Sequence, residues 1–192
     1  ATGLSSQQLK RAIDKFCANL EDFATLAANA FETLINATDP SQTELRDQLY
    51  SHMADKFADD PSTLARIRLM HGRYAETTGR ADRAVDIYVK GARESLQAVT
   101  PMLSLVDNAG RLLVERGATE KAIALHSQIF SELSAPTRRT TATVQTTWFQ
   151  VGLRLAKLHA LAGANDKHNK ILNTLFKAQG GETTQLTDLK RT

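Results

Sequence analysis

The sequence repeats one pattern around three glycines, Gly79, Gly117 and Gly163. Large residues lie twelve and five positions before each glycine, and a small residue lies seven positions before it. An acid lies three positions after each glycine, a base follows it, and an apolar residue lies eight positions after. In chain order these positions hold Ile67, Gly72, Tyr74, Asp82, Arg83 and Ile87; Leu105, Gly110, Leu112, Glu120, Lys121 and Leu125; and Val151, Ala156, Leu158, Asp166, Lys167 and Ile171. This agreement indicates three structural units built on one plan.

Each unit is predicted to be a hairpin of two helices joined at its glycine. Glycine adopts the left-handed conformation that ends a helix, and an acid in the next first turn faces the positive end of the helix dipole. The small residue lets the second helix approach the first closely. Each hairpin leaves an apolar face that only a neighbouring hairpin covers. We therefore expect an all-α fold with a right-handed stack of three helix-turn-helix repeats, at about 61–98, 101–134 and 138–179.

Residues 1–60 are predicted to form a separate helical hairpin. Apolar residues recur at steps of three and four over a first helix from about 5 to 35. Ser41 and Glu44 form a capping-box pattern that begins a second helix, which runs to about residue 58. Asp60 followed by Pro61 marks the start of the repeats, because aspartate caps free amide groups and proline is tolerated at the first helical position. Residues 180–192 are polar and are predicted to form a tail.

The third repeat departs from the common plan. Ala84 and Ala122 lie five positions after the first two glycines, whereas His168 takes this place in the third repeat. The spacing between the glycines also exceeds that of a minimal hairpin repeat. We therefore expect additional loop residues between the hairpins, at 97–101 and 134–138.

Charge is distributed unevenly along the chain. Residues 1–60 hold five Lys/Arg and ten Asp/Glu, a balance of −5, whereas residues 61–192 hold 19 and 11, a balance of +8. The repeat region therefore favours an acidic partner. A nucleic acid and an acidic protein surface both meet this requirement.

Residue types that build catalytic or metal sites form no recognised pattern here. Cys17 is the only cysteine, and the five histidines include no HExxH pair. His159 and His168 lie on either side of a turn glycine, but packing or surface roles are more common for such histidines. The sequence has no phosphate-binding glycine motif. We therefore predict no catalytic residue, no cofactor and no metal site. Membrane insertion is not expected, because no apolar run approaches the roughly 20 residues that cross a bilayer.

The segments Arg73–Tyr88 and Glu115–Leu125 resemble pentatricopeptide repeats and, nearly as closely, tetratricopeptide repeats. The resemblance covers the whole repeat region and implies an array of helical hairpins. It also implies a contact with single-stranded RNA, in which a polar side chain ten positions before the turn glycine reads a base. That position holds Leu69, Asp107 and Leu153 in this chain. Because a leucine offers no hydrogen bond to a base edge, the base-reading mechanism of the family is not carried over.

A narrower resemblance concerns the assembly to which such a chain belongs. A basic, helical chain with three repeats is similar to the short pentatricopeptide-type proteins that euglenozoan mitochondrial ATP synthases carry as extra subunits on the F1 head. This resemblance implies a mitochondrial location and a protein partner within a larger complex. The first residue, Ala1, fits either a processed terminus or a trimmed one.

Two function hypotheses follow from these observations. The first is a non-catalytic helical-repeat subunit that binds a protein partner in a larger assembly. Arginine and tryptophan are favoured at binding hot spots, so the residues predicted to contact the partner are Arg66, Arg73, Arg80, Arg138, Arg139 and Trp148. Trp148 has an alternative structural role, as filler of the groove between the second and third repeats. The second hypothesis is a single-stranded RNA-binding protein, whose phosphate contacts are Arg66, Arg68, Arg73, Arg80 and Arg83.

Overall fold

Helices form every regular element in the part of the chain that the structure describes. This computed structural model describes residues 42–178 and seven earlier positions, Gln7, Gln8, Arg11, Asp14, Lys15, Thr33 and Ile35. The rest of the predicted helix at 5–35, with Cys17, lies outside the described residues, as do Ser41 and the predicted tail at 180–192. The all-α prediction is confirmed.

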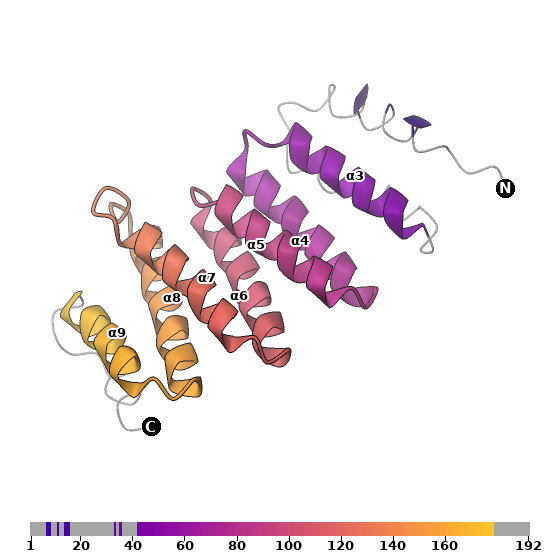
Figure 1. Ribbon diagram of the computed structural model, residues 1–192. Coiled ribbons are helices and arrows are strands. Elements are labelled where there is room, and N and C mark those ends of the chain that lie inside the picture. The colour runs from indigo at the N-terminus through magenta and orange to yellow at the C-terminus, as the bar shows by residue number, and fades with distance from the viewer. Residues whose placement is uncertain are drawn as a thin grey trace. The chain divides into compact units, whose positions relative to one another are not determined.

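Seven helices lie within residues 42–178 (Figure 1). They are α3 (Thr43–Lys56), α4 (Pro61–Thr77), α5 (Ala81–Glu94), α6 (Val99–Glu115), α7 (Thr119–Ser134), α8 (Ala142–Leu161) and α9 (Asn165–Ala178). The chain divides into two compact units, Ala1–Pro101 and Met102–Thr192. In the first unit α4 packs on α3 and on α5, and in the second unit α8 packs on α7 and on α9.

The three turn glycines lie between the helices of the three hairpins and have left-handed backbones. Their φ angles are 74° at Gly79, 73° at Gly117 and 72° at Gly163. The residue after each glycine donates its backbone N–H to a carbonyl five residues earlier, at 2.8 Å in every case. The three donor–acceptor pairs are Arg80 to Ala75, Ala118 to Leu113 and Ala164 to His159. This is the Schellman arrangement, which satisfies carbonyls that a helix end leaves free.

The small residues of the first helices lie against large residues of the second helices. The ring of Tyr88 covers Gly72, and a Cβ atom placed on Gly110 would lie 2.5 Å from Cε1 of His126. In the third hairpin Ala156 and Leu172 share one core cluster. Each large residue lies nine positions after its turn glycine. The two helices therefore approach closely because nothing larger than a methyl group separates them.

The start of α4 follows the predicted capping. One carboxylate oxygen of Asp60, Oδ1, accepts the backbone N–H groups of Ser62 at 3.0 Å and Thr63 at 3.1 Å. Pro61 occupies the first turn, where its missing N–H has no partner to lose. The capping bonds outweigh the effect of burial and lower the pKa of Asp60, with the Thr63 hydroxyl as the largest contributor.

Two connections differ in extent from the predicted loops. Helix α6 begins at Val99 and takes Pro101 into its first turn, where proline costs no hydrogen bond. Helix α8 begins later than residue 138, at Ala142, and Thr141 caps it by accepting the N–H of Val144 at 3.3 Å. The connection before α8 is therefore longer than the sequence pattern indicated.

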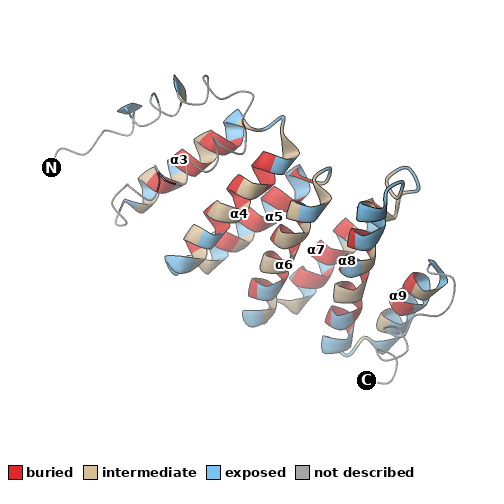
Figure 2. Cartoon of the chain, turned by 180° about the vertical axis from the view of Figure 1, so that it is seen from behind, coloured by how far each residue is buried: buried red, intermediate tan, exposed pale blue. Residues whose placement is uncertain are grey.

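The third hairpin is the most exposed of the three along its second helix. Figure 2 shows α9 mostly in pale blue, and its buried residues are Leu172 and Leu175. His168, the residue that departs from the repeat pattern, donates from Nδ1 to the carbonyl of Ala156 at 2.9 Å. The larger side chain is thus accommodated by a hydrogen bond between α9 and α8.

We expect Gly110→Ala to destabilise the chain by about 1–3 kcal/mol, because the new methyl group displaces His126 from its position against α6. Urea denaturation followed by circular dichroism measures this change. Gly117→Ala is the matched comparison, since no atom lies within 4 Å of its Cβ position and its cost comes from the left-handed backbone alone. Asparagine tolerates that backbone, so Gly117→Asn should recover stability and Gly110→Asn should not. Unchanged stability of Gly110→Ala would contradict the close approach.

Candidate docking groove

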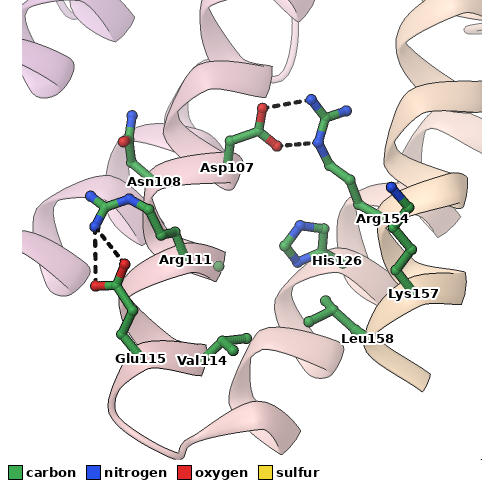
Figure 3. Close-up of a pocket in the computed structure, with 10 residues that line it drawn as sticks. Asp107, Asn108, Arg111, Val114, Glu115, His126, Arg154, Lys157 and Leu158 are labelled. Carbon is green, nitrogen blue, oxygen red and sulfur yellow. Dashed lines mark hydrogen bonds and ion pairs between the residues drawn. The ribbon is translucent and has the colours of Figure 1, made fainter. Parts of the chain in front are cut away.

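A groove of about 490 Å³ opens between α6 and α8 in the second unit, with α7 behind it. Figure 3 shows side chains from all three helices around this opening. The lining residues are Asp107, Asn108, Gly110, Arg111, Val114, Glu115, His126, Arg154, Lys157 and Leu158. Leu158 is buried, Val114 is half-buried, and charged residues surround this apolar floor. The groove thus combines an apolar interior with a charged rim.

An ion pair joins the two walls of the groove at one end. Arg154 of α8 approaches Asp107 of α6 through two contacts, Nε to Oδ1 at 2.5 Å and Nη2 to Oδ2 at 2.7 Å (Figure 3). Burial raises the pKa of the Asp107 carboxyl, and the guanidinium of Arg154 opposes that effect. About a third of each side chain remains exposed, 34% for Asp107 and 36% for Arg154. The pair holds α6 and α8 together and leaves neither charge uncompensated.

The imidazole of His126 forms the back of the groove, between the two walls (Figure 3). Nδ1 lies 2.9 Å from the carbonyl oxygen of Ala122, and because a carbonyl only accepts, Nδ1 carries the proton. Burial lowers the pKa of His126, so the ring is neutral near pH 7. Nε2 is therefore an unprotonated acceptor. The back of the groove carries no charge at that pH.

Basic side chains stand on both rims of the groove. Arg111 on α6 and Lys157 on α8 both lie six positions before a turn glycine, and both are exposed. Arg111 pairs with Glu115 at 3.1 Å, one helical turn away. An exposed pair of this kind contributes only about 0.3–0.5 kcal/mol, so another carboxylate can replace it at little cost. Lys157 makes no ion pair with any residue that the structure describes.

The described part of the second unit is basic as a whole. Residues 102–178 hold ten Lys/Arg and five Asp/Glu, a balance of +5. The groove lies within this stretch, and the two acids on its lining already face basic residues. An approaching partner therefore meets a positive potential around an apolar opening.

The predicted contact residue Arg80 is engaged inside the first unit. Its guanidinium donates to both carboxylate oxygens of Asp47 on α3, at 2.8 and 3.2 Å. It also lies over the ring of Tyr74, 5.1 Å from the centroid, and Arg46 lies over the same ring at 5.3 Å. Arg80 thus attaches α3 to the hairpin of α4 and α5.

His71 completes this attachment from α4. Its Nε2 lies 2.9 Å from Oδ1 of Asp47, and its ring stacks on Tyr50 with centroids 4.7 Å apart. Only 1% of its side chain is exposed, and this burial lowers the pKa of His71 to about 4. Burial alone raises the pKa of Asp47, but the hydrogen bonds from Arg80 and His71 outweigh it and lower that pKa. Asp47 is therefore ionised and His71 neutral at pH 7.

Trp148 lies in the interior, between α7 and α8. It is 5% exposed, stacks on Phe130 with centroids 5.3 Å apart, and donates its Nε1–H to the Ser134 hydroxyl at 2.8 Å. The guanidinium carbon of Arg139 lies over the ring of Trp148, 4.9 Å from its centroid, and both residues line a second hollow of about 840 Å³.

Of the remaining predicted residues, Arg66 and Arg73 belong to the first unit and Arg138 to the connection before α8. Arg66 and Arg138 are half-buried and Arg73 is exposed. None of the six residues predicted to contact a partner lines that groove. The sequence contains a pattern that indicates Arg111 and Lys157 as candidate contact residues. The position six before each turn glycine holds a base in all three repeats, including Arg73.

The positions that read bases in pentatricopeptide proteins are unsuited to that task here. Leu69 and Leu153 are half-buried leucines, and Leu153 packs with the core cluster of the third hairpin. Asp107 is held by Arg154. Among the described residues, no three histidines, cysteines or acids are placed to hold a metal ion. In the same part of the chain, no helix is long and apolar enough to span a membrane.

Comparison with known proteins finds distant matches among solved structures. No protein-family model matches the sequence, and no curated protein matches it significantly. BtubC (BKLC) from P. vanneervenii is 12% identical with a TM-score of 0.48, over 93% of this chain and 91% of that chain. A candidate kinesin light chain from Podosopora anserina with nearly identical TPR-like repeats is 10% identical with a TM-score of 0.41, over 90% of this chain and 94% of that chain.

We expect the stability of the chain to fall as the pH falls from 6.5 to 4. Between these values the unfolded chain protonates His71, whose ordinary pKa is 6.5, and the folded chain does not, because its pKa is about 4. This residue lowers the free energy of unfolding by about 3 kcal/mol, and the decrease is complete near pH 4. His126 acts in the same direction, since burial lowers its pKa also.

Urea denaturation at pH 7 and pH 4.5 tests this expectation with the His71→Gln variant. Glutamine keeps a hydrogen-bond donor toward Asp47 but does not titrate. The variant should lose clearly less stability between the two pH values than the wild type. Equal losses in the two proteins would exclude His71 as a source of the acid sensitivity.

Proposed function

We propose that this chain is a non-catalytic helical-repeat subunit that binds a protein partner within a larger assembly, through the groove of α6, α7 and α8. The observation that carries the proposal is the groove's composition: an apolar floor with a neutral back and exposed bases on both rims. Hairpin arrays present such surfaces to a helix or an extended segment of another protein. A non-catalytic role is part of the proposal, because binding at this surface needs no reacting group.

The assembly that we propose is the F1 head of mitochondrial ATP synthase, with the chain as an accessory subunit. Support for it comes from the sequence resemblance to short pentatricopeptide-type subunits and from the basic character of the second unit. A mitochondrial location belongs to the same proposal. The decisive observation is whether the chain co-migrates with F1 after gentle purification from mitochondria, or migrates alone at every salt concentration.

A protein partner is favoured over RNA by the chemistry of the groove and of the base-reading positions. An apolar floor of Val114 and Leu158 stabilises apolar side chains, whereas a sugar–phosphate backbone gains little there. Leu69 and Leu153 offer no hydrogen bond to a base edge. Single-stranded RNA binding is the alternative, supported by the pentatricopeptide resemblance and by the net positive charge of the repeat region.

We expect the double variant Arg111→Glu and Lys157→Glu to reduce partner binding at least tenfold, because it reverses the charge on both rims of the groove. The full-length tagged chain is produced in its source cells, and the partner that co-purifies is quantified by mass spectrometry. The matched control is Lys170→Glu with Lys177→Glu, which makes the same change of charge on α9, outside the groove. Circular dichroism confirms that both variants fold.

Equal losses in the groove variant and in the α9 control would contradict a role for this groove. Retardation of single-stranded RNA at low salt, with a steep loss at higher salt, would favour the RNA alternative. A lone chain without any protein partner would reject the proposed function.

A further inference from the structure

We propose that the groove of α6, α7 and α8 receives an acidic segment of the partner protein, with a carboxylate of that segment paired to Lys157 and an adjacent apolar side chain against Val114 and Leu158. This inference rests on the proposed function and specifies the chemistry of the partner. The charges on the two walls and the uncharged back of the groove support it.

The charged residues on the lining of the groove are unequally balanced. At one end Asp107 and Arg154 neutralise each other across the opening. Lys157, three residues after Arg154 on α8, has no acid among the described residues to pair with. Arg111, on the opposite rim, pairs with Glu115 of its own helix, and both side chains are about half exposed, 44% and 55%. An incoming carboxylate therefore meets, on α8, a cation that no acid of the described residues neutralises.

The existing ion pair shows what kind of group fits between these walls. Oδ2 of Asp107 accepts an N–H of Arg154, a residue 47 positions further along the chain, and Oδ1 lies in ion-pair contact with Nε of the same guanidinium. A partner carboxylate at Lys157 repeats this contact between molecules, on the same helix α8 and one turn further along. Aspartate and glutamate both supply the required group.

The interior of the groove selects what accompanies that carboxylate. His126 is neutral near pH 7, because burial lowers its pKa, and it presents a ring face rather than a charge. Val114 and Leu158 add aliphatic surface beside it (Figure 3). Apolar side chains gain from burial here, whereas a second charge loses its hydration without compensation. The favoured partner sequence is therefore an acid next to apolar residues, not an uninterrupted acidic run.

Zero-length cross-linking of the native complex tests this pairing directly. A carbodiimide joins a lysine amine to a carboxylate only when the two are in contact, so it reports the partner atom at Lys157. The complex of the full chain is isolated gently, treated with the carbodiimide, digested and analysed by mass spectrometry. We expect a link from Lys157 to an aspartate or glutamate of the partner that has an apolar neighbour in sequence.

Two variants and one control accompany the cross-linking. Lys157→Glu should weaken the complex more than tenfold, whereas Lys157→Arg, which keeps the charge, should weaken it less than threefold and abolish the link. Lys170→Arg on α9 should leave both the complex and the Lys157 link intact. Circular dichroism and a urea denaturation midpoint within error of wild type show that a variant is folded.

The outcomes separate this inference from the function on which it rests. A complex that forms normally and links only through lysines outside the groove overturns the acidic-segment pairing and leaves the interaction function standing. Equal weakening by Lys157→Glu and Lys157→Arg also overturns it, because charge would then be irrelevant. Absence of any complex rejects the proposed function and this inference together. If ribonuclease treatment dissociates the complex, the inference that a protein segment occupies the groove is overturned.

Discussion

The close contact between the two helices of a hairpin is the constraint on which the rest of this structure depends. Glycine at positions 72 and 110, and alanine at 156, let a large residue from the second helix lie directly on the first. This contact works only if the intervening turn reverses the chain at the right place, which the left-handed glycine achieves. The glycine turn and the helix–helix contact therefore depend on each other, and a short stretch of sequence specifies each hairpin.

Polar contacts take over where the hairpin plan ends. Helix α3 has no partner helix of the repeat type among the described residues of its own unit. Asp47 instead holds it to α4 and α5 through Arg80 and His71, while Leu49 and Met53 share a core cluster with Leu64. The buried, neutral His71 forms its hydrogen bond with the ionised Asp47 only in this arrangement, which makes the attachment specific.

The helices and their turns could be predicted from sequence, because glycine, capping residues and helical periodicity all act over a few residues. The cap at Asp60 and the three turn glycines illustrate this locality.

The groove could not be predicted in the same way. Arg154 reaches Asp107 across 47 residues and three helices, and that meeting depends on how the helices pack. The exposure of Lys157 and the burial of Trp148 follow from the same packing. Tryptophan is favoured at binding surfaces, but the buried ring of Trp148 contributes to the interior in this chain.

His126 occupies a position that serves both the packing of a hairpin and the lining of the groove. The same slot holds Tyr88 in the first hairpin and Leu172 in the third, so hairpin geometry accepts an aromatic, a polar ring or an aliphatic chain there. In the second hairpin that slot is also the back of the groove. A lineage can therefore retune what the groove recognises by exchanging one internal side chain, without redesigning the turn, the caps or the exposed rim.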